Sequence, residues 1–379
     1  MGYNDPETQG IAARWRAEFP VTQKLIYLNH AAVAPLPRRA AEAMQRQAED
    51  ACLHGSLHYP EWMAACDGVR EATARMVNAE AGEIALVKNT SEGIATVALG
   101  FPWKAGDRIV AFHEEFPANY YIWKKLEETK GVRVEWLSCF DGLEKVEAAA
   151  RGARFLAISF VQYLSGFRAD LEAIGAICRR EGVFFFVDAI QGLGAFPFDV
   201  RAMQVDAFAA DGHKWLLGPE GAGVLYIAKE WQDRIEPVEF GWTNVAGWAD
   251  YASRDMTLRK DAGRYEPGTL NVIGSFGLRA SMELLLEVGI PAVSKAIVAV
   301  TDRLAEGARA KGYEVLGERK PETAAGIVCL RKPGVDARVT HAHLRDRRMF
   351  GAPRQGWLRL SPHFYVSLED ADRVVEALP

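Results

Sequence analysis

The chain has 379 residues, of which 49% are hydrophobic, 25% charged and 10% aromatic, and this composition excludes disordered and collagen-like classes of protein. Its 45 Lys and Arg against 50 Asp and Glu give a net charge of −5 without any basic block, so we expect no nucleic-acid partner. The length allows two domains, or one large domain with an appendage.

The cysteines and the apolar runs indicate the compartment. The five cysteines are scattered, odd in number and without a CxxC pair, which argues against a disulfide framework and a structural zinc site. We assign no metal site, because His341 and His343 are two residues apart on an expected helix and therefore do not share a face of it. No apolar run approaches the roughly 18 residues of a membrane span, and the first ten residues lack the features of a targeting peptide. We therefore expect a cytoplasmic protein without a membrane partner.

Over residues 25–228, short apolar runs alternate with stretches of helical periodicity. This alternation predicts βα units that build a mostly parallel sheet with helices on both faces. One expected helix spans residues 38–53 and opens after Pro37, and another starts near Asp170 and ends near Gly182. Seven strands are expected, at residues 83–87, 108–112, 132–137, 155–160, 183–188, 207–210 and 224–227.

After residue 228 the pattern changes to a Trp- and Gly-containing loop at 241–268 and a long helix near 271–288. A smaller α+β set follows, with strands at 326–330 and 357–360, a helix at 336–348 and a final helix capped by Ser367 and Asp370. We therefore divide the chain into three parts. They are an N-terminal segment, 1–22, that packs with the small domain; a large α/β domain, 23–270; and a small C-terminal α+β domain, 271–379.

Two polar residues stand at the ends of expected strands. Asp188 ends an apolar strand at the rim of an open α/β sheet, where such folds bind ligands, although a capping aspartate is the alternative. Lys214 lies in a strand-to-strand turn beside His213 and a Gly-rich segment, where an exposed surface lysine is the alternative. Neither Asp188 nor Lys214 alone distinguishes a ligand-binding role from its structural alternative.

The turn at 88–93 is a third candidate. It opens a helix with the hydroxyl side chains of Thr90 and Ser91, so it suits a phosphate at the positive end of the helix, or else it forms a plain cap. A phosphate cradle, a buried carboxylate and a positioned lysine together match the needs of pyridoxal phosphate (PLP). The lysine forms a Schiff base with the aldehyde, the carboxylate keeps the ring nitrogen protonated, and the helix end holds the phosphate.

Six short motifs follow one another in the order found in a known family. They are Tyr27-Leu28-Asn29-His30-Ala31, Asn89-Thr90-Ser91-Glu92-Gly93, Val187-Asp188-Ala189-Ile190-Gln191, Gly212-His213-Lys214-Trp215, Glu266-Pro267-Gly268-Thr269-Leu270-Asn271 and Leu358-Arg359-Leu360-Ser361-Pro362. With them the sequence resembles the class V aminotransferase superfamily of fold-type I PLP enzymes, which includes cysteine desulfurases and isopenicillin N epimerase-like proteins. The resemblance covers both expected domains.

The resemblance implies a role for each matching residue. Lys214 is the Schiff-base lysine and, once displaced by substrate, carries a proton between the substrate Cα and the C4′ atom of the cofactor. Asp188 pairs with the ring nitrogen, and Gln191 bonds the ring hydroxyl. The phosphate ligands are Thr90, Ser91, His213 and, from the partner subunit of a homodimer, Thr269.

Two aromatic residues depart from the family pattern. Phe116 stands where the family often has His, and either ring could stack on the cofactor ring. A core-facing Phe that opens a helix is the alternative. Tyr163 stands where many members carry Asn, so its expected contact with the ring hydroxyl stays open.

Arg359 matches the arginine that binds the substrate α-carboxylate, and a guanidinium fork suits that task. Asn29 and His30 match a loop that faces the cofactor pocket in the epimerase-like branch. His30 could contact substrate, assist acid–base chemistry or make only structural hydrogen bonds. Four arginines before Arg359 are mostly surface charge, although one could bind a second carboxylate: Arg345, Arg347, Arg348 and Arg354.

Cysteine desulfurases place their persulfide-forming cysteine on the loop before this arginine, and residues 346–358 contain none. We therefore expect no sulfur transfer through such a residue and interpret Cys329 as a core residue. The expected function is PLP-dependent chemistry at Cα of an amino acid, with class V transamination as the first choice. A C–S lyase or epimerase of the same superfamily is the alternative, and a non-catalytic cofactor-binding homologue is less favoured.

Overall fold

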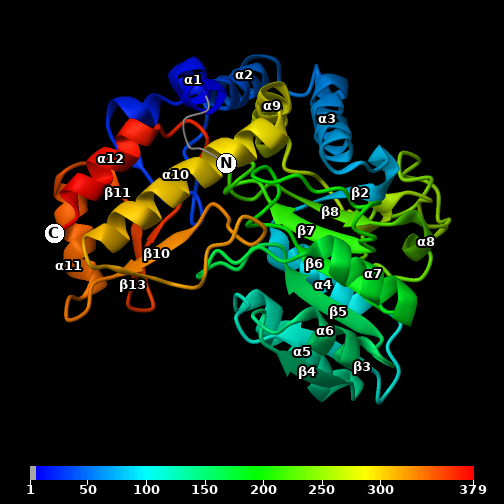
Figure 1. Ribbon diagram of the computed structural model, residues 1–379. Coiled ribbons are helices and arrows are strands. Elements are labelled where there is room, and N and C mark those ends of the chain that lie inside the picture. Colours follow the sequence, from blue (N-terminus) through cyan, green and yellow to red (C-terminus); the bar gives the residue numbers. More distant parts are fainter. Residues whose placement is uncertain (1–5) are drawn as a thin grey trace.

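The computed structural model describes residues 6–379 and has a seven-stranded sheet at its centre (Figure 1). The strand order is β2-β8-β7-β6-β5-β3-β4, and β8 runs antiparallel to both β2 and β7, whereas all other adjacent pairs are parallel. The seven-stranded, mostly parallel sheet expected from the sequence is confirmed, and each strand begins and ends within one residue of its expected bounds. The strands are β2 (Ile84–Val87), β3 (Arg108–Phe112), β4 (Arg133–Leu137), β5 (Phe155–Ser159), β6 (Phe184–Asp188), β7 (Ala207–Asp211) and β8 (Gly223–Ile227).

The central strands are buried on both faces. In β6, Phe184 and Phe186 belong to one apolar cluster, whereas Phe185 and Val187 belong to the other. Because side chains alternate along a strand, a strand buried on both faces has a continuous apolar sequence. Helices α4 (Thr90–Gly100) and α5 (Ala118–Lys130) contribute side chains to the Phe184 cluster, and α6 (Leu143–Ala150) and α7 (Leu171–Glu181) are among the helices that contribute to the Phe185 cluster.

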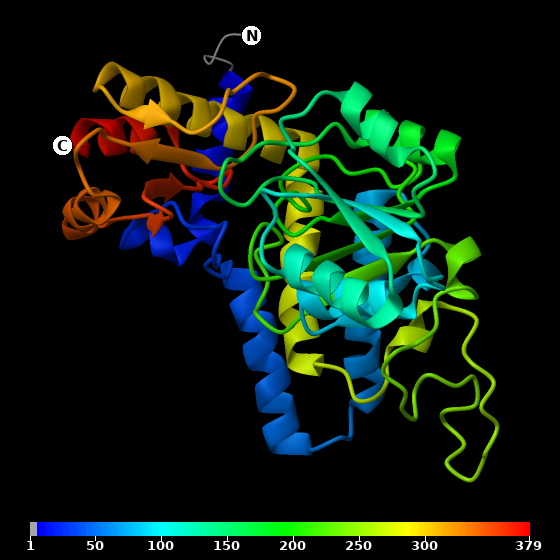
Figure 2. The ribbon, with the colours of Figure 1, turned by 90° about the horizontal axis from the view of Figure 1, so that it is seen from below.

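Three long helices form a separate layer at one end of the sheet. Helix α9 (Val272–Val288) packs against both α2 (Arg38–His54) and α3 (Tyr59–Val77), and the three run side by side in Figure 2. After the short helix α8 (Lys229–Gln232), the chain between 233 and 261 extends as a long loop away from the sheet (Figure 2). The loop returns through the 3₁₀ turn η4 (Ala262–Tyr265) to the residues that precede α9.

The C-terminal part is built on helix α10 (Ile290–Ala310) and a four-stranded sheet with the order β12-β13-β10-β9. As expected, Ser367 and Asp370 form a capping box at the start of the last helix. The remaining elements are β9 (Glu314–Val315), β10 (Val328–Arg331), α11 (Ala337–Asp346), β11 (Met349–Phe350), β12 (Ala352–Arg354), β13 (Trp357–Leu360) and α12 (Leu368–Ala377).

The described part of the N-terminal segment contacts these C-terminal elements. Helix α1 (Pro6–Trp15) packs on α10, and an ion pair of 2.6 Å joins Arg16 to Asp370. The ring of Phe19 stacks on Tyr365 with 3.7 Å between centroids, and β1 (Ile26–Tyr27) pairs with β11. Residues 1–5 of the expected 1–22 segment lie outside the described residues, and the proposed domain boundaries stay a prediction.

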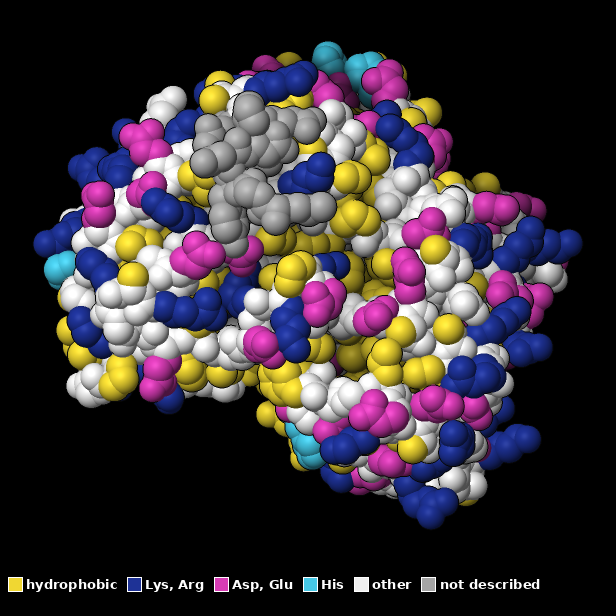
Figure 3. All heavy atoms as spheres, in the orientation of Figure 1, with side chains coloured by type: hydrophobic (Ala, Val, Ile, Leu, Met, Phe, Trp, Pro, Cys, Tyr) yellow, Lys and Arg dark blue, Asp and Glu magenta, His cyan; other side chains and the backbone are white. Residues whose placement is uncertain are grey.

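Three properties of the described chain bear on function: its surface charge, its helix lengths and its possible metal ligands. Figure 3 shows Lys and Arg side chains interspersed with Asp and Glu over the visible face, without a large patch of one sign. Within residues 6–379, no single helix is long and apolar enough to span a membrane, and α9 and α10 meet the criterion only as a pair bent by 84°. The same residues contain no cluster of three His, Cys, Asp or Glu side chains arranged to hold a metal ion.

Candidate active site

The carboxyl ends of neighbouring strands meet at one edge of the central sheet. Strand β6 ends at Asp188, which pairs in register with Ser159 at the end of β5, and β7 ends at Asp211. Open α/β sheets bind ligands at this edge. A cavity of about 180 Å³ lies here, lined by Asn89, Thr90, Ser91, Phe116, Ala118, Ser159, Tyr163, Asp188, Ile190, Gln191, Asp211, His213 and Lys214. Eight residues predicted from the sequence are therefore brought together.

Lys214 supplies the amine of this cavity. Burial lowers its pKa to about 8, and the charges of Arg359 and Arg354 act in the same direction, against Asp188 and Asp211. The Nζ atom lies 5.8 Å from the centroid of the Phe116 ring. A lysine with a lowered pKa is partly uncharged near neutral pH, so its amine can attack a carbonyl carbon.

Asp188 supplies a carboxylate at the floor of the same cavity. It is 3% exposed, and its Oδ2 accepts a hydrogen bond of 2.7 Å from Nδ2 of Asn119. Its Oδ1 accepts one of 3.1 Å from the backbone N–H of Ile190. Burial raises the pKa of Asp188, while these two bonds and the charge of Lys214 lower it. The carboxylate is thus held in one orientation, suited to a cationic N–H group in the cavity.

The start of α4 forms the third side of the cavity. Asn89 caps the helix by accepting a 2.9 Å hydrogen bond from the backbone N–H of Glu92. The hydroxyl of Thr90 is buried and has no hydrogen-bond partner among residues 6–379. Buried hydroxyls are nearly always bonded, and the first N–H groups of a helix have no acceptor within it. The helix start therefore suits an anion, and the observed Asn89 cap is compatible with the expected phosphate cradle.

Two further side chains frame the cavity. Gln191 donates through Nε2 to the Ala31 carbonyl (3.1 Å) and accepts through Oε1 from Nε1 of Trp215 (2.8 Å), so its amide is fixed with one N–H left over. His213 is half-buried, and its Nδ1 lies 3.1 Å from Oδ2 of Asp211.

The aromatic residues Phe116 and Tyr163 lie against each other at the mouth of the cavity. Phe116 is 48% exposed, so it is not the core-facing residue that was the alternative from sequence. The two rings meet edge to face with 5.4 Å between centroids. A flat apolar face beside Lys214 suits a planar ring in the cavity.

Pyridoxal phosphate fits this set of residues. The unpartnered hydroxyl of Thr90 lies at a helix start that favours a phosphate, the oriented carboxylate of Asp188 favours a protonated ring nitrogen, and Lys214 carries a reactive amine. Phosphate, ring and aldehyde each have a matching partner.

Arg359 lies on β13 and is not among the residues that line the 180 Å³ cavity, but it is close enough to Lys214 to influence the pKa of that amine. It is 3% exposed, its Nη1 donates to the Tyr163 carbonyl (2.8 Å), and its Nε has no partner. Burial lowers the pKa of Arg359 to about 10. No carboxylate of the described chain forms an ion pair with it, and a buried unpaired guanidinium is costly. A carboxylate from a ligand would supply the missing partner.

The structure does not bring His30 to the cavity. Its Nδ1–H donates to the Ser361 carbonyl (2.8 Å), and its Nε2 accepts from the Tyr365 hydroxyl (2.7 Å). Complete burial lowers the pKa of His30 to about 4, so the ring is neutral. These contacts describe the structural role that was one of the alternatives. Asn29 is also absent from the cavity lining, and its buried Oδ1 has no partner in the described chain.

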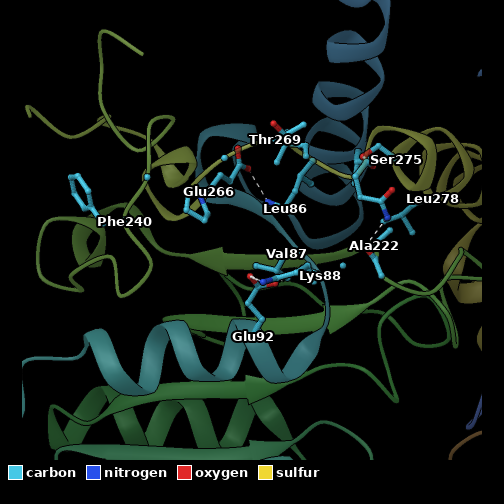
Figure 4. Close-up of a pocket in the computed structure, with 18 residues that line it drawn as sticks. Leu86, Val87, Lys88, Glu92, Ala222, Phe240, Glu266, Thr269, Ser275 and Leu278 are labelled. Carbon is cyan, nitrogen blue, oxygen red and sulfur yellow. Dashed lines mark hydrogen bonds and ion pairs between the residues drawn. The ribbon is translucent and has the colours of Figure 1, made fainter. Parts of the chain in front are cut away.

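Thr269 lines a different cavity, of about 320 Å³, which shares no lining residue with the Lys214 cavity (Figure 4). Glu266 and Thr269 come from the loop before α9 and face Lys88 and Glu92 across this space. Thr269 is therefore separated from the other expected phosphate ligands within one chain.

Glu115 is a buried residue that the sequence analysis missed. Its carboxyl accepts hydrogen bonds from the Ser159 backbone N–H (2.7 Å) and from Nε2 of Gln162 (2.8 Å), and it also contacts the Ser159 hydroxyl. Burial raises the pKa of Glu115 to about 7, and the charge of Asp188 adds to this effect. In the sequence, Glu115 is marked as a candidate site residue only by its position directly before Phe116 and four residues before Asn119.

Cys329 is not placed for sulfur chemistry. It lies directly opposite Arg359 in the β10–β13 pair, and its Sγ contacts the Leu164 carbonyl at 2.9 Å. Burial raises the pKa of this thiol to about 12, so it is protonated at neutral pH. The interpretation of Cys329 as a core residue agrees with these contacts.

The fold and the cavity are those of a PLP-dependent enzyme of fold type I. The family described as Aminotransferase class-V matches residues 26–350, and the chain belongs to this family. A probable cysteine desulfurase of Pyrococcus abyssi is 31% identical, and the match covers 96% of both chains.

Two solved structures superpose closely on this fold. The apo cysteine desulfurase from Thermococcus onnurineus has a TM-score of 0.88 at 27% identity, covering 97% of this chain and 96% of the other. A mutant of C-DES with glycine covalently linked to its PLP cofactor has a TM-score of 0.88 at 22% identity, covering 96% and 98%, and this likeness supports the fold alone.

Proposed function

We propose that this protein is a class V aminotransferase that removes the Cα proton of an amino acid substrate. The observation that carries the proposal is the pair formed by Lys214, an amine with a pKa lowered to about 8, and Arg359, a buried guanidinium without a carboxylate partner in the described chain. An amine that lines the cavity and a carboxylate binder close enough to lower the pKa of that amine match the two ends of an α-amino acid.

Each residue has a defined task in this reaction. When bound, pyridoxal phosphate draws electrons from the substrate Cα into its ring. With the cofactor held in the cavity, Arg359 would bind the α-carboxylate, Lys214 would take up the Cα proton and release it again within the site, and Asp188 would favour a protonated ring nitrogen. Phe116 and Tyr163 line the same cavity and offer aromatic faces to a planar ring.

A β-eliminating C–S lyase is the second candidate. The relative of 31% identity is a probable cysteine desulfurase, yet residues 346–358 of this chain contain no cysteine that could carry a persulfide. Loss of a sulfur leaving group after removal of the Cα proton needs no such residue. The first proton transfer by Lys214 is the same in both candidates.

Product analysis separates the two candidates. The holoenzyme is incubated with a panel of L-amino acids without an acceptor, and the products are identified by mass spectrometry. A keto acid formed once per active site, with aminated cofactor, supports transamination. Continuous release of pyruvate and ammonia from a cysteine thioether would instead support the lyase.

We also propose that the enzyme is a homodimer in which Thr269 binds the phosphate of the partner subunit's cofactor. Thr269 lines a cavity that includes Lys88 and Glu92, whereas the Lys214 cavity includes Asn89, Thr90 and Ser91 of the same turn. Thr269 is thus separated from the phosphate cradle of its own chain, and in the proposed homodimer the Thr269 of a second subunit would complete that cradle.

A further inference from the structure

The hairpin of β12 and β13 carries two arginines on one face. In the pairing register, Ala352 lies opposite Arg359, and Arg354 lies opposite Trp357. Directly opposed residues of antiparallel strands share a face, and side chains alternate along each strand. Arg354 and Arg359 are therefore diagonal neighbours on the same face, with about 7–8 Å between their backbone positions.

Both arginines lie close enough to the Lys214 amine to affect its pKa. Arg359 and Arg354 each lower the pKa of Lys214, and Arg354 also lowers the pKa of Arg359. Arg354 is exposed, and its Nη1 donates only to the Pro353 carbonyl, at 3.0 Å. In the part of the chain that is described, no carboxylate forms an ion pair with Arg354. The nearby carboxylate of Asp336 is bound by Arg338 at 2.9 Å.

The tip of the hairpin is held against the large domain. Gln355 and Gly356 form a two-residue turn with φ of 47° and 80°, as a tight hairpin requires. Nε2 of Gln355 donates to the hydroxyl of Tyr163 at 2.7 Å. Because Tyr163 lines the Lys214 cavity, this bond holds the tip of the hairpin beside that cavity. Arg354, one residue earlier, itself lines a neighbouring surface cavity of about 470 Å³.

We propose that Arg354 binds a second anionic group, at the end of the substrate side chain, while Arg359 binds the α-carboxylate. This inference rests on the proposed function, since it names the substrate class of the same cavity. The class is short α-amino acids whose side chain ends in a carboxylate, sulfinate or phosphate. Two guanidinium groups with unused donors, at diagonal positions of one strand pair, match two anionic groups a few bonds apart.

Binding of unreactive analogues to the holoenzyme tests the inference without turnover. Isothermal titration calorimetry with succinate, a dianion, and butyrate, a monoanion of similar length, gives their ratio of affinities. We expect succinate to bind the wild type at least ten-fold more tightly than butyrate. Arg354→Gln should remove this difference without changing the affinity for butyrate. Arg354→Lys should retain part of the difference. Arg347→Gln is the matched control, because Arg347 is exposed and bonds only the His343 carbonyl in its own helix. An unchanged ratio in Arg354→Gln, with an unchanged melting temperature, overturns the inference.

Steady-state kinetics separate this inference from the proposed function. We expect kcat/KM for aspartate or glutamate to exceed that for asparagine or glutamine, and Arg354→Gln to reduce it at least ten-fold through KM. If no amino acid reacts but succinate binding still depends on Arg354, the anion site stands and the proposed reaction fails. If neutral amino acids react equally well and the binding ratio does not change, the reaction stands and the second anion site is wrong.

Discussion

Lys214 is the residue whose electrostatic surroundings matter most for the chemistry. Burial and the charge of Arg359 lower its pKa, so substitution of Arg359 by Gln should raise it. We expect the rate at which the apoprotein attaches PLP to rise with pH through a midpoint near 8, and this midpoint to move upward in Arg359→Gln. The attachment is followed by visible absorbance. The same midpoint in both proteins would contradict the assigned effect of Arg359.

Glu115 predicts a pH dependence of stability. Its pKa is raised to about 7 in the folded protein, whereas in the unfolded chain it has the ordinary value of 4.5. Between these two pH values the folded state binds more protons, so this group lowers the free energy of unfolding as the pH rises from 4.5 to 7. Glu115→Gln keeps a carbonyl oxygen that accepts from the Ser159 backbone N–H and from Nε2 of Gln162, places an amide N–H toward the Ser159 hydroxyl oxygen, and removes the charge.

Thermal unfolding of the wild type and Glu115→Gln at pH 5 and pH 8 checks this expectation. The wild type should lose more stability over this interval than the variant. Glu127, whose pKa is lowered and whose carboxylate pairs with Lys124, offers a control, because Glu127→Gln should not flatten the curve over the same interval. Equal losses in wild type and Glu115→Gln would show that Glu115 has no raised pKa.

The individual side chains of the site were only partly predictable. Asp188 and Lys214 stand out in the sequence because a strand or a turn presents each of them locally. His30 is neutral because the fold buries it completely, and its hydrogen-bond partners Ser361 and Tyr365 lie more than 330 positions away along the chain. Asn119, the partner of Asp188, is 69 positions away from it, so its contact arises from the fold alone. Local pattern carries no information about such pairs.

At the scale of elements, the start of α4 gives a direct test of the phosphate cradle. Thr90→Val keeps the shape of the side chain and removes the unpartnered hydroxyl. A hydrogen bond to a charged group contributes about 1.5–3 kcal/mol, so we expect the dissociation constant of PLP to rise roughly ten- to hundred-fold. Thr96→Val is the control on the same helix, because the Thr96 hydroxyl bonds the Glu92 carbonyl. Equal effects of the two substitutions would argue against a phosphate at this helix start.

The elements that were predicted correctly are those with long apolar or periodic patterns. The buried strands β5 to β7 are continuous apolar runs, and α7 begins at its Asp170 cap and ends at Gly182 as expected. The two-residue strands β1, β9 and β11 were missed, because two residues show no alternation. The antiparallel direction of β8 was also not specified, since direction depends on how the chain returns to the sheet.

At the scale of the whole molecule, the proposed homodimer predicts complementation between two inactive variants. Lys214→Ala removes the amine, and Thr269→Asp places a negative charge where a phosphate is expected. If Thr269 acts in the partner subunit, mixed dimers of the two variants contain one site with both native residues. We expect each variant alone to be inactive and the refolded mixture to regain activity.

The mixture should reach up to about a quarter of wild-type activity, as random pairing gives half mixed dimers with one intact site each. No regained activity, together with mixed dimers detected by native mass spectrometry, would place Thr269 in its own subunit's site instead.

The central claim, that Lys214 holds the cofactor at the edge of the sheet, has one direct test. The holoenzyme is reduced with borohydride, digested and examined by tandem mass spectrometry for a pyridoxyl group. We expect the label on the peptide that contains Lys214 and on no other lysine. A stoichiometric label on a different lysine, or no label in a protein saturated with PLP, would contradict the account.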